Sequence, residues 1–185
     1  MDLIEQLGKY KPFNEQEERD KEEILRHLRE ESNIFSRENR CAHITASSWI
    51  LNRSHNKILM VYHNIYNSWS WSGGHADGEQ DLLSVAIREA REETGITHIK
   101  PITEEIFSLE ILTVDGHIKR GVYVPSHLHL NITYLLEADD QEAVQICPDE
   151  NSGVSWFELE DAVAASSEPW MRERIYSKLN AKLRV

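Results

Sequence analysis

The segment GGHADGEQDLLSVAIREAREETGI, residues 73–96, holds the pattern that decides the fold of this chain. Asp81 stands where an N-cap belongs and Gly95 supplies a residue that commonly ends a helix, so the pattern predicts a helix between them. Its apolar residues recur at helical spacing and form one stripe, made of Leu82, Leu83, Ala86, Ile87 and Ala90. The glycines before the helix predict a flexible loop, formed by Gly73, Gly74 and Gly78.

Three carboxylates crowd one edge of the predicted helix. Glu89, Glu92 and Glu93 are spaced i, i+3 and i+4, so they fall within an arc of roughly 100°. Like charges at this spacing repel by roughly 0.2–0.5 kcal/mol per pair, and a helix selected only for stability would interleave Lys or Arg. A divalent cation reverses the sign of this interaction, and hard cations such as Mg²⁺ prefer carboxylate oxygen. The alternative interpretation is a solvated acidic face that holds no ligand.

The same residues resemble the Nudix box, written G, five residues, E, seven residues, R-E-U-x-E-E-x-G-U, where U is aliphatic. Aligned without gaps, the box covers residues 74–96, and every specified position except one agrees. The exception is Gln80, which stands where the family has its first glutamate. Gln80 keeps a hydrogen-bond acceptor for the box arginine, Arg88, but without charge assistance. Glu79 and Asp81 are neighbouring carboxylates that offer a substitute.

The resemblance implies a pyrophosphohydrolase that depends on Mg²⁺ or Mn²⁺. Carried over residue by residue, it implies that Glu89, Glu92 and Glu93 bind the metal, with the backbone carbonyl of Gly74 as a further ligand. Arg88 is implied to orient Glu89. The implied reaction is hydrolysis of a diphosphate bond, by metal-activated water, in a nucleoside diphosphate linked to another moiety or in a related small phosphorylated metabolite.

A further acid is expected outside the box, because many Nudix proteins take a metal ligand or general base from another loop. Glu150, in the loop before the last expected strand, is the candidate, and Asp149 and Glu142 are its rivals. An ordinary solvated loop acid is the alternative for Glu150. The remaining acids after the box are expected at the surface; they are Glu104, Glu105 and Glu110.

Three histidines are candidates for substrate contact. His75 follows the glycine pair of the predicted loop, where a donor can reach a phosphate, although a loop hydrogen bond is the alternative. His127 and His129 share one face of an expected strand and suit either a phosphate or a metal. No third ligand for such a metal is evident from the spacing.

Apolar runs on both sides of the box helix predict strands, and further helices follow. The expected strands are residues 41–53, 57–63, 106–114, 128–137 and 154–157, and the expected later helices are residues 160–165 and 169–183. Strands before and after a central helix indicate a mixed sheet covered on both faces. The predicted fold is therefore α/β, a three-layer α/β/α sandwich, and the Nudix resemblance implies the same.

Residues 1–38 are predicted to form an N-terminal helical extension, and residues 39–185 the Nudix domain. Pro12 divides the extension into two helices, and Asn14 is expected to cap the second, with Glu17 three residues later. The apolar face of this second helix is thin. We therefore expect it to pack by one edge on the domain or at a dimer contact.

Composition restricts the partners. A formal net charge of −12 over 185 residues argues against a nucleic-acid polymer, because such binding relies on Lys and Arg to neutralise phosphates. No apolar run approaches the roughly 18 residues of a membrane-spanning helix, and the N-terminus lacks the pattern of a signal peptide. We therefore expect a cytoplasmic protein that binds a small phosphorylated, nucleotide-derived substrate, and the family suggests a homodimer.

Two other functions are compatible with the fold. The first is a non-catalytic nucleotide-binding regulator, in which Gln80 is one sign of lost catalysis. The second is an isopentenyl-diphosphate isomerase, although the sequence shows no constellation of cysteine, tryptophan and glutamate that would perform its protonation.

Overall fold

A mixed sheet forms the centre of the computed structural model, which describes residues 2–119 and 121–184. Within these residues the eight strands of this sheet are β1 (Ala42–Asn52), β2 (Lys57–His63), β3 (Ser68–Ser70), β4 (Ser72–His75), β5 (Lys100–Pro101), β6 (Ser108–Val114), β9 (His127–Ala138) and β10 (Asn151–Glu158). The strand order is β10-β2-β1-β9-β5, with β3 paired to β2, β4 to β1 and β6 to β9. β1 and β9 are parallel, and the other pairs are antiparallel.

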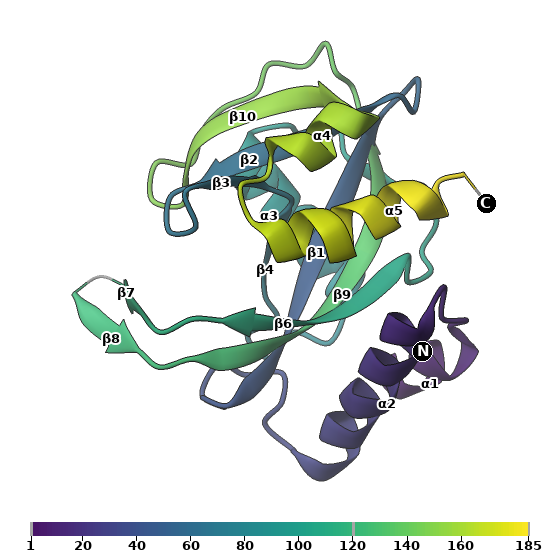
Figure 1. Ribbon diagram of the computed structural model, residues 1–185, viewed down its shortest axis with the longest axis vertical. Helices are drawn as coiled ribbons and strands as arrows, with labels where there is room; N and C mark the ends of the chain where they lie inside the picture. Colours follow the sequence, from purple (N-terminus) through teal and green to yellow (C-terminus); the bar gives the residue numbers. More distant parts are fainter. Residues whose placement is uncertain (1, 120, 185) are drawn as a thin grey trace.

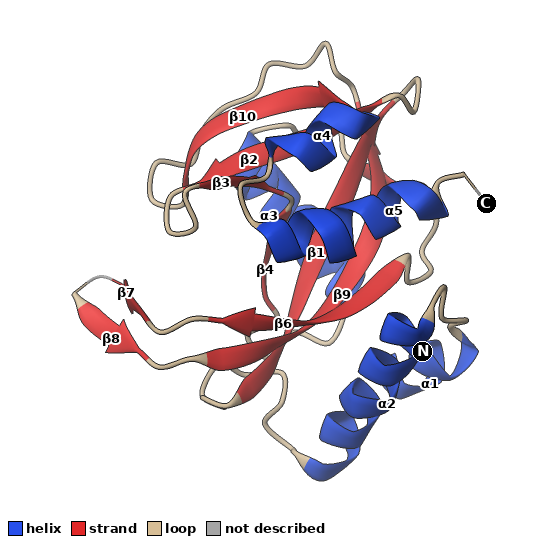
Figure 2. Ribbon diagram, viewed as in Figure 1, coloured by secondary structure: helices blue, strands red, loops and turns tan. Residues whose placement is uncertain are grey.

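Helices cover both faces of this sheet (Figures 1 and 2). They are α1 (Leu3–Lys9), α2 (Glu15–Glu30), α3 (Leu82–Thr94), α4 (Leu159–Ala165), a π-helical turn (Met171–Tyr176) and α5 (Ser177–Lys182). In Figure 1, α3 lies behind the sheet and α4 and α5 lie in front of it. The predicted α/β/α sandwich with a mixed sheet is confirmed. No helix in the described part of the chain is long and apolar enough to cross a membrane.

Alternate residues of β1 separate two hydrophobic clusters, because successive side chains of a strand point to opposite faces. One cluster packs against α3 and includes Ala42, Ile44, Ala46 and Ile50 from β1. The other packs against the C-terminal helices and includes Trp49 and Leu51 from β1. The odd-numbered residues of β1 therefore face α5, and the even-numbered residues face α3.

The box helix, α3, begins and ends where the sequence predicts. Asp81 caps it, since its Oδ1 accepts a hydrogen bond from the Ser84 N–H at 3.2 Å, and Gly95 ends it in the left-handed conformation with φ 74°. The buried stripe differs from the prediction, because Val85 is fully buried while Leu83 and Ile87 are only partly so. Val85, Glu89 and Glu93 form one row at i, i+4 and i+8, and this rotation carries two box glutamates toward the interior.

The N-terminal extension packs on the domain through both apolar and ionic contacts. Leu3 and Leu7 of α1 and Ile24 of α2 join the same cluster as the α3 residues. Asn14 caps α2 as predicted, accepting from the Glu17 N–H at 3.0 Å. Glu17 instead turns inward, where it is fully buried.

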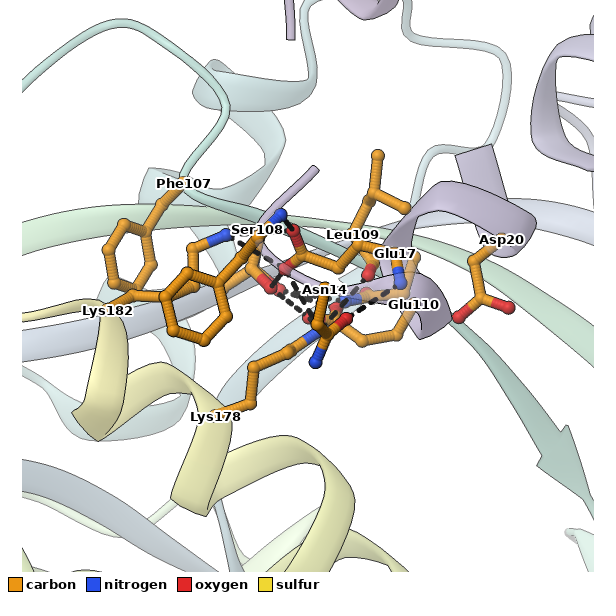
Figure 3. Close-up of polar contacts among 12 residues, drawn as sticks. Asn14, Glu17, Asp20, Phe107, Ser108, Leu109, Glu110, Lys178 and Lys182 are labelled. Atoms are coloured by element: carbon orange, nitrogen blue, oxygen red, sulfur yellow. Dashed lines mark hydrogen bonds and ion pairs between the residues drawn. The ribbon is translucent and has the colours of Figure 1, made fainter. Parts of the chain in front are cut away.

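A buried ionic network joins this extension to the sheet and to α5 (Figure 3). Lys178 Nζ lies 2.9 Å from Glu110 Oε1 and 3.1 Å from Glu17 Oε1, and Lys182 Nζ lies 2.8 Å from Glu17 Oε1. Glu17 and Glu110 are both 0% exposed. The expectation that Glu110 lies at the surface was therefore wrong, because its partner comes from the far end of the chain.

One expectation about a loop was also wrong, and one hairpin was not predicted. Gly73 and Gly74 lie in strand β4, paired with Ser47 and Ala46 of β1, rather than in a flexible loop. The segment between the strands β6 and β9 holds a hairpin of β7 (His117–Lys119) and β8 (Val122–Val124), which extends away from the sheet in Figure 1. Glycines and short exposed strands give little β signal in a sequence.

Candidate metal and substrate site

Glu93 is the most deeply buried acid of the box, at 3% exposure. The Gly73 N–H donates to its Oε2 at 3.1 Å, and the Asn151 side chain donates to its backbone carbonyl at 2.9 Å. No Lys or Arg among residues 2–119 and 121–184 forms an ion pair with Glu93. A buried carboxylate without a cationic partner is costly, so this position favours a bound cation.

Burial and neighbouring acids raise the pKa of two box glutamates. For Glu93, burial raises the pKa well above its ordinary value, and the charges of Glu150, Glu89 and Glu92 raise it further. Burial also raises the pKa of Glu89, although the hydrogen bond from Arg88 partly opposes this shift. Glu92 is exposed on the same helix. A divalent cation would relieve both the desolvation and the mutual repulsion, so the donor set fits Mg²⁺ or Mn²⁺.

Gly74 lies against the carboxylate of Glu89. A Cβ atom added at Gly74 would meet Cδ and Oε2 of Glu89 at 2.4 Å. The backbone of β4 and the side chain of Glu89 from α3 therefore lie close together, and the Gly74 carbonyl stays a predicted ligand.

We expect Gly74→Ala to lower kcat by about 10- to 100-fold, because the new methyl group displaces Glu89 and a shift near 1 Å in a reacting group can cost about 100-fold. The clash involves the end of a flexible side chain, so the fold should persist. Gly8→Ala is the matched control, since a Cβ there meets nothing within 4 Å. Steady-state kinetics and thermal unfolding of both variants test this; unchanged kcat in Gly74→Ala would mean that Glu89 can move without consequence.

Arg88 and Gln80 do not interact as the resemblance suggests. Arg88 Nη2 donates to Glu89 Oε1 at 3.0 Å, and among the described residues no hydrogen bond joins Arg88 to Gln80. Glu79 accepts from the backbone N–H groups of Gln80 and Asp81, and Asp81 caps α3, so neither replaces the missing glutamate. Arg88 is positioned to orient Glu89 without help from position 80.

Restoring the consensus acid should therefore have little effect. Gln80 is exposed, and an exposed ion pair contributes about 0–1 kcal/mol. We expect kcat/KM of Gln80→Glu to stay within about fivefold of the parent value, since about 1.4 kcal/mol corresponds to tenfold. Parallel kinetics on the two proteins check this. A rise of more than tenfold would show that Gln80 weakens the site.

Glu150 lies near the box carboxylates of α3. Its charge contributes to the raised pKa of both Glu93 and Glu89. The following residue, Asn151, anchors this loop to α3 through the Glu93 carbonyl. Glu142 is engaged elsewhere, because its carboxylate accepts from the Thr97 N–H at 2.8 Å.

The sequence of residues 42–178 matches the family described as NUDIX domain, and this match covers most of the chain. The chain belongs to the Nudix family. Its Nudix relatives include the m7GpppN-mRNA hydrolase NUDT17 of Xenopus laevis, which is 31% identical over 112 residues, or 57% of this chain. That alignment spans 36% of the relative's length.

Solved Nudix structures share the fold at lower identity. The Ap4A hydrolase of C. elegans, in a binary complex, matches with a TM-score of 0.53 at 23% identity, over 76% of this chain and 94% of that one. A Nudix-family hydrolase from Clostridium perfringens matches with a TM-score of 0.54 at 21% identity, over 79% and 97%. At this identity the likeness shows the fold.

The position of one charged residue beside the Nudix box was not predicted from the sequence. Arg37, in the N-terminal extension, binds Asp77 through Nε at 2.6 Å. The charges of Glu89 and Glu150 also act on the Arg37 guanidinium. Residues 37 and 77 are too far apart in the sequence for their spacing to indicate this contact. The extension thus adds a cation to the rim of the site.

The candidate histidines lie together, with a fourth that the sequence did not single out. Ring centroids of His43 lie 5.0 Å from His75, 4.9 Å from His127 and 5.0 Å from His129. His43 is at the start of β1, and its burial lowers its pKa. His127 and His129 share one face of β9, as predicted.

Proposed function

We propose that this chain hydrolyses a diphosphate bond in a nucleoside diphosphate linked to another moiety, or in a related small phosphorylated metabolite, with Mg²⁺ or Mn²⁺. The observation that carries the proposal is the buried carboxylate of Glu93, which has no cationic partner in the described chain and lies among other acids. Membership of the Nudix family supports hydrolysis of a pyrophosphate bond.

Four groups would hold the cation: the carboxylates of Glu89, Glu92 and Glu93 and the backbone carbonyl of Gly74. When bound, a divalent cation neutralises phosphate oxygens and activates water for attack on phosphorus. Arg88 keeps Glu89 in place through its hydrogen bond. The protein's own task is then mainly positioning, as in other phosphoryl-transfer sites.

Glu150 is proposed as the group that accepts a proton from the attacking water. It comes from an exposed loop outside α3, and its charge is felt by Glu93 and Glu89. Arg37, on which the charges of Glu89 and Glu150 act, supplies a donor for the substrate phosphates. In this arrangement the box carboxylates bind the cation, and Arg37 at the edge of the site attracts the substrate phosphates.

The proposal is tested by assaying the purified protein with Mg²⁺ or Mn²⁺ against nucleoside triphosphates, dinucleoside polyphosphates, ADP-ribose, nucleotide sugars and the cap dinucleotide m7GpppG. ³¹P NMR of the products identifies the bond that breaks, and EDTA provides the metal-free control. We expect turnover of at least one class that stops with EDTA. Nucleotide binding with no turnover in any class would favour the regulator instead.

The homodimer and the cytoplasmic location both remain predictions. Light scattering on the purified protein measures its molar mass and therefore tests the homodimer. The N-terminal extension is proposed as a separate unit of residues 1–38, although its contacts to α5 and β6 join it tightly to the domain.

A further inference from the structure

Four histidines converge on the face of the sheet opposite the Nudix box helix. His43 comes from β1, His75 from the end of β4, and His127 and His129 from β9. One ring nitrogen from each of His43, His75 and His129 lies within 4.8 Å of the others. His127 Nε2 lies 3.2 Å from His129 Nε2.

Strand register explains why these residues meet. His43 and His129 are direct partners across the parallel pair of β1 and β9. His75 is the partner of Thr45 across β4 and β1, so it lies on the same face as His43, one step diagonally along. This is the α5 face, whereas Gly74 and the box carboxylates of α3 belong to the other. The histidine cluster and the carboxylate site are thus separate.

His43 presents an unpartnered nitrogen to this cluster. Its side chain is 4% exposed, and its Nδ1 lies 2.9 Å from the backbone carbonyl of Asn39. A carbonyl only accepts hydrogen bonds, so Nδ1 carries the proton and Nε2 carries a lone pair. His43 Nε2 is buried and has no hydrogen-bond partner in the described chain. Leaving such a buried group unsatisfied is unfavourable.

His127 repeats this arrangement. Its Nδ1 lies 2.9 Å from the backbone carbonyl of Pro125, which leaves Nε2 as the nitrogen directed at His129. A ring nitrogen bonded to a carbonyl, with the opposite nitrogen free to coordinate, is the usual support for a metal-binding histidine. Two backbone carbonyls therefore fix which ring nitrogen of His43 and of His127 is presented to the cluster.

We propose that His43, His75 and His129 bind a transition-metal ion of the Zn²⁺ class, with His127 as the adjacent fourth donor. Neutral imidazole suits Zn²⁺ and its neighbours, whereas Mg²⁺ requires oxygen ligands. Zn–N bonds near 2.0–2.1 Å place nitrogens about 3.4 Å apart in a tetrahedron, so modest side-chain rotations close the site. The ion would join β1, β4 and β9 on the sheet face opposite the hydrolytic metal, and this inference does not depend on the proposed reaction.

The test is calorimetric titration of chelator-treated protein with Zn²⁺ alone, in buffer with excess Mg²⁺ to occupy the carboxylates. We expect about one Zn²⁺ per chain, and binding weakened at least tenfold in His129→Gln and in His43→Gln. His129 is half-buried, so its variant keeps the test valid if the His43 variant does not fold. Co²⁺ alone should give the visible absorption of a four-coordinate nitrogen site in the parent protein.

Two controls separate this site from others. His98→Gln changes a histidine that is 84% exposed and distant from the cluster, and it should leave Zn²⁺ binding unchanged. Glu93→Gln should also leave it unchanged, because that residue belongs to the carboxylate site. Equal Zn²⁺ affinity in the parent protein and His129→Gln, or loss of Zn²⁺ in Glu93→Gln, would overturn the proposal.

Discussion

Replacing Glu93 with glutamine is expected to lower kcat by more than about 100-fold while the protein remains folded. Loss of a group that only supports a metal ligand costs about 10- to 100-fold, and removal of a ligand should exceed that. Glutamine keeps the shape of the side chain and can still accept from the Gly73 N–H. The loss would therefore report the missing charge rather than a rearranged helix.

For the same variant we expect stability to be unchanged or higher, in contrast to the loss of kcat. Because burial raises the pKa of Glu93, the folded protein holds this proton more tightly than the unfolded chain does, and stability increases as pH falls through the folded pKa. At neutral pH the ionised carboxylate is therefore unfavourable without metal. Glu93→Gln should melt at the same or a higher temperature than the metal-free parent, and Mg²⁺ should raise only the parent's melting temperature.

Glu104→Gln is the matched control, since Glu104 is exposed and outside the site. It should leave kcat and the effect of Mg²⁺ unchanged. If Glu93→Gln retained kcat within tenfold of the parent with the same metal dependence, Glu93 would not be a metal ligand. The substrate assay would still stand, so the role of this residue and the reaction class are tested separately.

Replacing Lys178 with methionine is expected to destabilise the protein by about 3–5 kcal/mol, the usual cost of removing one partner from a buried ion pair. Lys178 has a side-chain exposure of 3% and contacts Glu17 and Glu110, which are fully buried. The substitution leaves two acids with Lys182 as the remaining cation of this network. Urea unfolding at neutral pH measures the change.

A matched exposed pair provides the control for this prediction. Lys100 pairs with Glu137 at a side-chain exposure of 72%, so Lys100→Met should change the unfolding free energy by less than about 0.5 kcal/mol. Adding Glu110→Gln to Lys178→Met restores the charge balance and should recover part of the loss. Equal stability of Lys178→Met and Lys100→Met would show that the network contributes little.

The pH dependence of stability should reveal the same network. Burial alone would raise the pKa of Glu17, but the charge of Lys178 and hydrogen bonds from Lys182 and Tyr10 lower it from 4.5 to about 2. The stabilisation is thus present above pH 4.5 and is lost as pH falls toward 2, because only the unfolded chain takes up the proton in that window. Unfolding in urea at pH 7 and pH 3 should show a smaller difference for Glu17→Gln than for the parent.

The sequence predicted those parts of the fold whose signals are local. Both ends of α3 follow from residues next to them, Asp81 and Gly95, and the pairing of β1 with β2 follows from two apolar runs around a turn. The box carboxylates were also predictable, because a helix brings i, i+3 and i+4 together wherever it occurs. Short-range geometry is fixed before the rest of the chain is placed.

The parts that failed depend on distant residues. Glu110 can be buried because Lys178 pairs with it. His43 lies beside His129 because β1 pairs with β9. Neither partner is indicated by spacing. The burial of Val85 in place of Leu83 and Ile87 also could not be predicted locally. The sheet on which a helix packs decides which of its sides becomes buried.

The long parallel ladder of β1 and β9 limits how this protein can change. It pairs Ala42 with Leu128 and continues without interruption to Asn52 and Ala138. An inserted or deleted residue near the start of β1 would shift every later β1 side chain to the opposite face, bringing Trp49 and Leu51 against α3 and Ala46 and Ile50 toward α5. A substitution in this buried strand disturbs one site on one face, whereas a single shift in register would disturb both faces together, so the length of β1 is constrained.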